Sequence, residues 1–117
     1  MEIKKTSSAD LGDINNERIG FSVLKSCQLK YFIVFKTKIT DGGFINRSKN
    51  AYWFLPQEVK VGDKIVLYTR TGQKSVKKNK DGSNTYFFFW GLSSALYNSP
   101  KDKIVLINIK EYKTDRE

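Results

Sequence analysis

The amino-acid sequence predicts an all-β fold, in the form of a small antiparallel β-sandwich with six to seven strands. From residue 18 onward, short runs of aromatic and β-branched residues alternate with polar residues, which is the pattern of strands. Residues that favour turns separate these runs, as at Asp41-Gly42-Gly43 and Asp81-Gly82-Ser83. The one candidate for a helix, residues 92–96, is too short for more than a single turn.

Strands are expected over residues 19–26, 30–40, 51–55, 64–70, 85–90 and 103–111, with a short additional strand considered over 44–47. Side chains alternate between the two faces along each strand. In the second segment this alternation places four apolar side chains on the expected core face, namely Tyr31, Ile33, Phe35 and Ile39. Phe32 and Val34 then share the opposite face with Lys30, Lys36 and Lys38.

Strands of this kind can bury their apolar faces as two packed sheets or as a small barrel, and we favour the sandwich. Leu, Ile, Val and Phe make up 33 of the 117 residues, which is enough for one buried core. We expect a single β-sandwich domain over residues 19–113. A flexible or irregular N-terminal arm over residues 1–18 should precede it, and a polar C-terminal tail over residues 114–117 should follow it.

The chain is strongly basic. Lys and Arg number 21 against 12 Asp and Glu, so the net charge is +9. Such a balance favours an anionic partner, which can be nucleic acid, anionic lipid or an acidic protein. Most of the basic residues are Lys, which contacts phosphate as a point charge and does not read bases as Arg does. An alternative is that the lysines only keep the protein in solution and protect strand edges.

The residues that usually carry catalysis are scarce. The chain has no His, which removes the commonest general base and the Ser–His and Cys–His nucleophile pairs. Cys27 is alone, so it can form neither an intramolecular disulfide nor a zinc site. The acidic residues at turns, Asp41, Asp63, Asp81 and Asp102, are expected to bind nearby backbone groups. We therefore expect no catalytic residues, no metal and no cofactor, and hence no enzyme.

The apolar runs are short. None exceeds five residues, whereas a membrane-spanning helix needs about 20, so no membrane span is expected. Lys4 and Lys5 are not followed by an apolar stretch, so the N-terminus does not resemble a signal peptide. The sequence accordingly predicts a cytoplasmic protein.

A lysine-rich segment, residues 70–80, lies between two expected strands. It contains no acidic residue, and the first one after it is Asp81. If strands 64–70 and 85–90 pair as neighbours, this segment is the protruding connection of a hairpin with concentrated positive potential. Such a tip can bind nucleic-acid phosphates without reading the sequence. The candidate nucleic-acid-binding residues are Arg70, Lys74, Lys77, Lys78 and Lys80. The alternative is a mobile loop whose lysines favour solubility.

Two aromatic segments, 52–54 and 86–90, are the other candidates. Alternation places Tyr86, Phe88 and Trp90 on one face and Phe87 and Phe89 on the other. An exposed set beside the lysines would suit stacking of unpaired bases. A lysine-free apolar set would instead suit a protein interface, and the alternative to both is a strand buried in the core. The candidate surface aromatics are Tyr52, Trp53, Tyr86 and Trp90.

Several segments between residues 53 and 107 carry a resemblance to a known family: Trp53-Phe54-Leu55-Pro56, Val61-Gly62-Asp63-Lys64-Ile65-Val66-Leu67-Tyr68, Trp90-Gly91-Leu92, Leu96-Tyr97-Asn98 and Asp102-Lys103-Ile104-Val105-Leu106-Ile107. This part of the chain resembles the lamin-tail domain family. The resemblance implies an immunoglobulin-like β-sandwich and a non-catalytic module that binds proteins or nucleic acid.

The expected function is therefore that of a non-enzymatic binding module. Its basic tip and aromatics would engage an anionic partner, with nucleic acid bound without strong sequence specificity as the leading hypothesis. The alternative is a protein-interaction or assembly module that uses an aromatic surface or an exposed strand edge.

Overall fold

The computed structural model of the chain describes residues 1–40, 43–44 and 50–115. Within these residues it contains eleven strands and one short 3₁₀ turn, η1 (Leu29–Tyr31). The strands are β1 (Ile3–Ala9), β2 (Arg18–Val23), β3 (Cys27–Gln28), β4 (Phe32–Thr40), β5 (Gly43–Phe44), β6 (Ala51–Trp53), β7 (Glu58–Val59), β8 (Lys64–Tyr68), β9 (Ser75–Lys78), β10 (Asn84–Phe89) and β11 (Asp102–Asn108).

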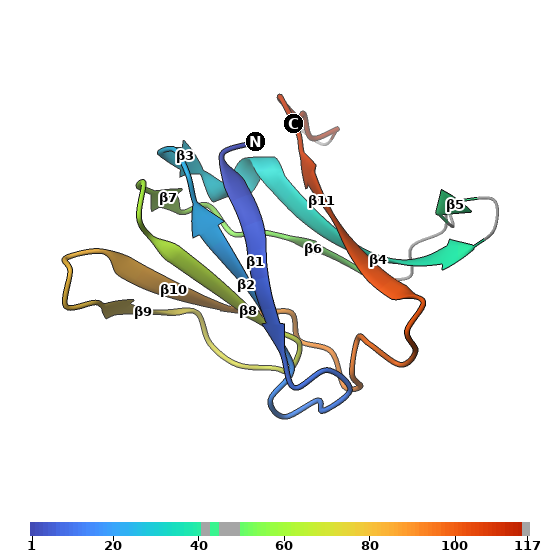
Figure 1. The fold of residues 1–117 in the computed structure, drawn as a ribbon. Helices are drawn as coiled ribbons and strands as arrows, with labels where there is room; N and C mark the ends of the chain where they lie inside the picture. The colour runs from blue at the N-terminus through green and yellow to red at the C-terminus, as the bar shows by residue number, and fades with distance from the viewer. Residues whose placement is uncertain (41–42, 45–49, 116–117) are drawn as a thin grey trace.

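The strands form two main sheets (Figure 1). The first has five strands in the order β1-β2-β8-β10-β9. In the second, β4 pairs with β11 on one side and with β5 and β6 along the other. The short strands β3 and β7 pair with each other. The predicted all-β sandwich is thus confirmed, and no helix of the described residues is long and apolar enough to cross a membrane.

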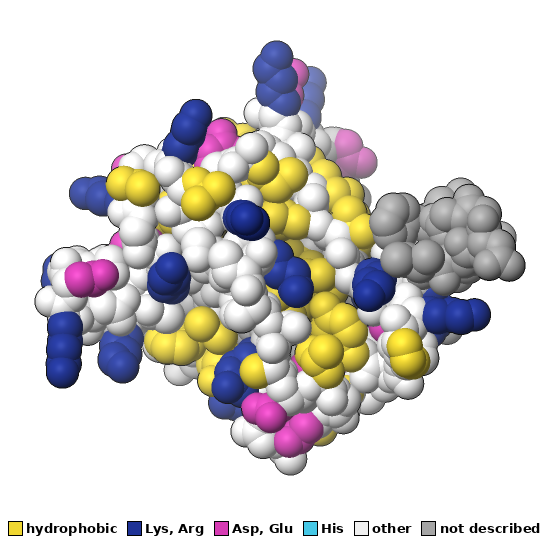
Figure 2. Space-filling view, viewed as in Figure 1, with side chains coloured by type: hydrophobic (Ala, Val, Ile, Leu, Met, Phe, Trp, Pro, Cys, Tyr) yellow, Lys and Arg dark blue, Asp and Glu magenta, His cyan; other side chains and the backbone are white. Residues whose placement is uncertain are grey.

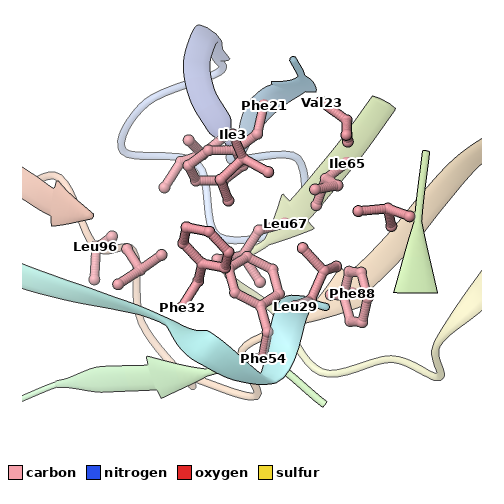
Figure 3. Close-up of a cluster of buried hydrophobic side chains, with 13 residues drawn as sticks. Ile3, Phe21, Val23, Leu29, Phe32, Phe54, Ile65, Leu67, Phe88 and Leu96 are labelled. Atoms are coloured by element: carbon pink, nitrogen blue, oxygen red, sulfur yellow. The ribbon is translucent and has the colours of Figure 1, made fainter. Parts of the chain in front are cut away.

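The core lies between the two sheets. Four phenylalanines are almost fully buried in it, namely Phe21, Phe32, Phe54 and Phe88 (Figure 3). Phe54 makes edge-to-face contacts with Phe21 and Phe88, with ring centroids 6.0 and 5.2 Å apart. Such aromatic pairs add roughly 0.5–1.5 kcal/mol each to the stability that burial alone provides. Phe54, which follows β6, therefore joins the second sheet to β2 and β10 of the first.

The N-terminal segment differs from the expected flexible or irregular arm. Residues 3–9 form β1, which pairs with β2 along its length and has a bulge between Lys5 and Ser7. Ile3 is its only buried side chain, and five of its other six residues are exposed. A strand held by backbone hydrogen bonds and one apolar anchor has no period-2 hydrophobic pattern, so the sequence did not reveal it.

The faces of β4 are also the reverse of the expectation. Phe32 and Val34 are buried in the core, whereas Ile33 and Phe35 lie half-buried on the outer side. The prediction assigned Phe32 and Val34 to the outer face because they alternate with Lys36 and Lys38. Lys38 can follow the core-facing residues because its side chain reaches the buried carboxylate of Asp102. Its ammonium group donates a hydrogen bond of 2.6 Å to the Asp102 carboxylate. The optional strand at 44–47 overlaps β5 at Phe44, and residues 45–47 lie outside the described residues.

The lysine-rich segment does not connect two strands of one hairpin. β8 and β10 are neighbours, as expected, but they run parallel, which is an exception to the expected antiparallel sheet. The chain leaves β8, forms β9 as an additional edge strand, and returns as β10 between the two. The actual hairpin is β9–β10, whose turn is closed by the Asn79 N–H donating to the Ser83 carbonyl at 2.8 Å. Gly82 supplies the positive φ of +89° that this turn requires.

Candidate nucleic-acid interface

The outer side of the five-stranded sheet is turned away from the core and is here called the basic face. Strand register brings five side chains into one row across all five strands: Lys4, Ser22, Lys64, Thr85 and Lys77. The three lysines are exposed and are each two strands apart, so their backbones are spaced by about 10 Å. None of them forms an ion pair with a described residue. The row therefore presents regularly spaced ammonium groups outside any salt bridge of the described residues. Of the three, Lys64 also donates a hydrogen bond to the Ser22 hydroxyl at 3.1 Å and interacts with the charge of Asp81.

A second row runs beside the lysines and has small residues toward its two ends and apolar side chains at and beside its centre. It consists of Ser7, Gly20, Val66, Phe87 and Ser75. At Gly20 a Cβ atom would lie 2.3 Å from the Ser7 hydroxyl oxygen, so any larger residue there would require the Ser7 side chain to move. Phe87 and Val66 are partly exposed on this side. The centre of the basic face is thus a shallow apolar platform next to a row of lysines.

The next row holds a layered aromatic cluster. Tyr68 and Phe89 stack with ring centroids 5.3 Å apart and an interplanar angle of 11°. The Arg70 guanidinium lies 4.9 Å from the Tyr68 ring centre and 5.0 Å from that of Phe89. Arg70 also donates hydrogen bonds to the carbonyls of Asn15 and Thr71, at 3.1 and 3.0 Å. These contacts hold Arg70 in place, which makes it a rigid border of the platform.

The basic residues predicted from the sequence do not gather at one tip. Lys77 lies on the basic face, and Lys78 alternates to the opposite side of β9. Lys80 is in the hairpin turn, and the Lys74 ammonium lies 5.6 Å from the centre of the buried Phe88 ring. Figure 2 shows lysine and arginine side chains projecting around the part of the molecule that β9 and β10 form. Positive charge is therefore spread over the hairpin and continues across the sheet through Lys64 and Lys4.

Three of the four predicted surface aromatics pack against the core. Tyr52, Tyr86 and Trp90 are half-buried there, and the rings of Tyr52 and Trp90 are 5.8 Å apart. Burial raises the pKa of Tyr52 to about 12. Trp53 is 46% exposed on the outer side of the second sheet, where its indole N–H donates to the Lys30 carbonyl at 2.6 Å. Trp53 is thus the one of the four that lies at the surface.

The aromatics of the basic face, Tyr68, Phe87 and Phe89, were not among the candidates. The sequence carried a signal, because Phe87 and Phe89 alternate away from Tyr86 and Phe88. Assigning the outward set required the parallel register, in which Phe88 pairs with the buried Leu67 and Phe87 with the partly exposed Val66. That pairing is not visible in the sequence.

The buried carboxylates are occupied by structural hydrogen bonds. The Glu17 carboxylate accepts from the Gly12, Leu96 and Tyr97 N–H groups and the Thr69 hydroxyl, at 2.6 to 3.2 Å. The Asp63 carboxylate accepts from the backbone N–H groups of Lys60 and Asn84, both at 2.9 Å. Each of these donors is fixed by the fold, so both carboxylates serve to hold loops and strand ends together.

Asp102 is a third carboxylate of this kind. It accepts from Lys38 and from the N–H groups of Asn98 and Ser99, at 2.6 to 2.9 Å. Burial acts to raise the pKa of Asp102, but these hydrogen bonds and the nearby Lys36 outweigh it and hold the pKa below its usual value. The expected turn role of Asp63 and Asp102 is confirmed.

Cys27 is the one cysteine of the chain and is partly buried. Burial, with a smaller contribution from Glu2, raises the pKa of the Cys27 thiol to about 11, so it stays protonated at neutral pH. Across the described part of the chain, no group of three or more Cys, Asp or Glu side chains is placed to hold a metal ion. The surface feature with the clearest binding chemistry is therefore the basic face.

Comparison of the chain with protein-family models, with curated proteins and with solved structures finds no match. The fold defines the chain as an all-β sandwich.

Proposed function

We propose that the protein is a non-enzymatic binding domain whose basic face binds single-stranded nucleic acid without strong sequence specificity. The observation that carries the proposal is the register of Lys4, Lys64 and Lys77 in one row beside the platform of Val66 and Phe87. Lysines in such a row can contact successive phosphates, and an aromatic side chain on a sheet can stack an unpaired base. Both kinds of contact tolerate any sequence.

The chemistry favours a single strand over a duplex. A base can stack on Phe87 only if it is unpaired, and such a contact is worth about 1–3 kcal/mol. The salt slope is the change in the logarithm of the binding constant with the logarithm of the salt concentration. Three lysine–phosphate contacts on a single strand give a slope of about −2, so affinity should fall about 20-fold between 50 and 200 mM salt. Lysine-only phosphate contacts, with Arg70 engaged inside the protein, supply little base discrimination.

Fluorescence anisotropy with a labelled single-stranded oligonucleotide tests this proposal. A Lys4→Ser, Lys64→Ser, Lys77→Ser variant removes three charges from the basic face. A matched control, Lys25→Ser, Lys60→Ser, Lys101→Ser, removes three exposed charges elsewhere. The face variant should lose about 0.7 units of salt slope per lysine, which is about 2 in total, while the control keeps the slope. Equal losses in the two variants would overturn the assignment of the face.

A second pair of variants tests the stacking platform. Phe87→Leu keeps an apolar side chain but removes the ring, and should weaken single-strand binding by about 1–3 kcal/mol without changing the salt slope. Phe35→Leu makes the same change on the outer side of the second sheet and should leave binding unchanged. Unaltered binding by Phe87→Leu would leave only an electrostatic contact and refute base stacking.

A further inference from the structure

The two sheets leave a groove open along one side of the sandwich. β1 and β11 border it, and among the described residues β1 pairs only with β2 and β11 only with β4 (Figure 1). The groove has a volume of about 720 Å³ and is lined by side chains of both strands and of two loops, including Lys5, Ser8, Leu11, Tyr97, Lys103 and Ile104. Figure 2 shows hydrophobic side chains at the surface between these two strands. Apolar surface thus lies next to unpaired strand edges.

The walls of the groove are held in place from inside the protein. The Glu17 carboxylate accepts from the N–H groups of Gly12 and Tyr97, and Asp102 accepts from those of Asn98 and Ser99. Leu11, beside them, is 51% exposed, so its apolar surface is left open. A groove with fixed walls costs little ordering on binding, which favours affinity.

The free edge of β11 can accept another strand. Its register with β4 is unbroken over seven residue pairs. The Ile109 N–H donates to the Tyr31 carbonyl at 2.8 Å and therefore points toward β4. Because backbone groups alternate in direction along a strand, the N–H groups of Ile104 and Leu106 point to the free edge. β1 is less suited, since a bulge interrupts it between Lys5 and Ser7.

The charges at the groove select the partner. Lys5 and Lys103 lie on opposite walls, and the whole chain carries +9. Pairing of two copies through β11 would bring like charges together, which lysines on edge strands commonly prevent. A strand with carboxylates would instead be attracted, and its apolar side chains would cover Leu11, Tyr97 and Ile104.

We propose that the β11 edge and this groove bind an extended segment of a partner protein that alternates apolar and acidic side chains. The segment adds a strand to the second sheet, with main-chain hydrogen bonds to Ile104 and Leu106 and apolar side chains in the groove. This site is separate from the basic face and does not depend on nucleic-acid binding.

Amide hydrogen exchange measured by NMR tests the proposal. The probe is a capped seven-residue peptide alternating Val and Glu, at millimolar concentration. The amides of Ile104 and Leu106 should exchange at least about tenfold more slowly with the peptide, whereas Val105 and Ile107, already bonded to β4, should not change. The same peptide with a central Pro should protect neither amide. Absence of protection, or equal protection by the Pro peptide, would overturn the proposal.

Charge reversal tests the specificity. Lys5→Glu with Lys103→Glu should abolish protection by the Val/Glu peptide and allow protection by a Val/Lys peptide. Lys25→Glu with Lys60→Glu changes the net charge equally and should leave the preference intact. If a single-stranded oligonucleotide protects Ile104 and Leu106 instead, the groove is part of a nucleic-acid site and the proposed partner is wrong.

Discussion

Two regions of the molecule use charge in opposite ways. Around Glu17, a fully buried carboxylate accepts four hydrogen bonds and joins the loop before β2, the end of β8 and the loop before β11. In the β9–β10 hairpin, Lys77, Lys78 and Lys80 are exposed and have no ion-pair partner in the described structure. The negative charge stabilises the fold, and the positive charge is left available to a ligand.

The comparison explains why the surface is even more basic than the net charge of +9 indicates. Glu17 and Asp63 direct their carboxylates at backbone N–H groups, and Asp102 binds Lys38 and two N–H groups. None of these three carboxylates is at the surface to neutralise the lysines of the basic face. A formal net charge counts all acids equally, whereas an approaching anion meets mainly the exposed groups.

The largest effect on stability is expected when the Glu17 carboxylate is removed. Glu17→Ala leaves three N–H groups and the Thr69 hydroxyl without their acceptor in a buried site. Each orphaned group costs about 1–3 kcal/mol, so we expect a loss of at least about 3 kcal/mol in the free energy of unfolding. Urea unfolding at pH 7 measures it. A loss below about 1 kcal/mol would show that the loops do not depend on this carboxylate.

An intermediate effect is expected at Asp102, together with a pH dependence. Asp102→Asn weakens three hydrogen bonds to a buried carboxylate, which should cost about 2 kcal/mol at pH 7. Because the folded-state pKa of Asp102 is lowered, its stabilisation is complete above the unfolded pKa of about 4 and is lost as the pH falls through the folded pKa. Unfolding of both proteins at pH 7, 4 and 2 should show the difference shrinking only toward the acid end. A constant difference would contradict this assignment.

The smallest effect on stability is expected in the hairpin. Replacing Lys74, Lys77, Lys78 and Lys80 with Ser should change the free energy of unfolding by less than about 0.5 kcal/mol, because these side chains are exposed. The urea midpoint is the measurement. A larger loss would mean that these lysines contribute to the fold as Glu17 does, and the contrast between the two regions would disappear.

The sequence predicted β2, β4, β6, β8, β10 and β11 because each has an apolar or aromatic run, but it missed β9, whose exposed residues include two lysines. It also predicted the roles of Asp63 and Asp102, because both lie at turns. It did not single out Glu17, whose carboxylate accepts hydrogen bonds from residues that lie 52 to 80 positions away in the sequence. It also did not reveal the parallel pairing of β8 and β10, since alternation fixes which residues share a face but not which strands are neighbours. The basic face depends on that pairing, so its lysine row was invisible until the strands were placed.

The insertion of β10 between β8 and β9 has a consequence for the order of folding. The β9–β10 hairpin closes over the few residues from Asn79 to Ser83, so its loop entropy is small and it can form within microseconds. Pairing of Lys64 with Thr85, 21 residues apart, must wait for a larger loop to close. The hairpin is therefore expected to dock onto β8 as a preformed unit, and the lysine row of the basic face is completed only at that step.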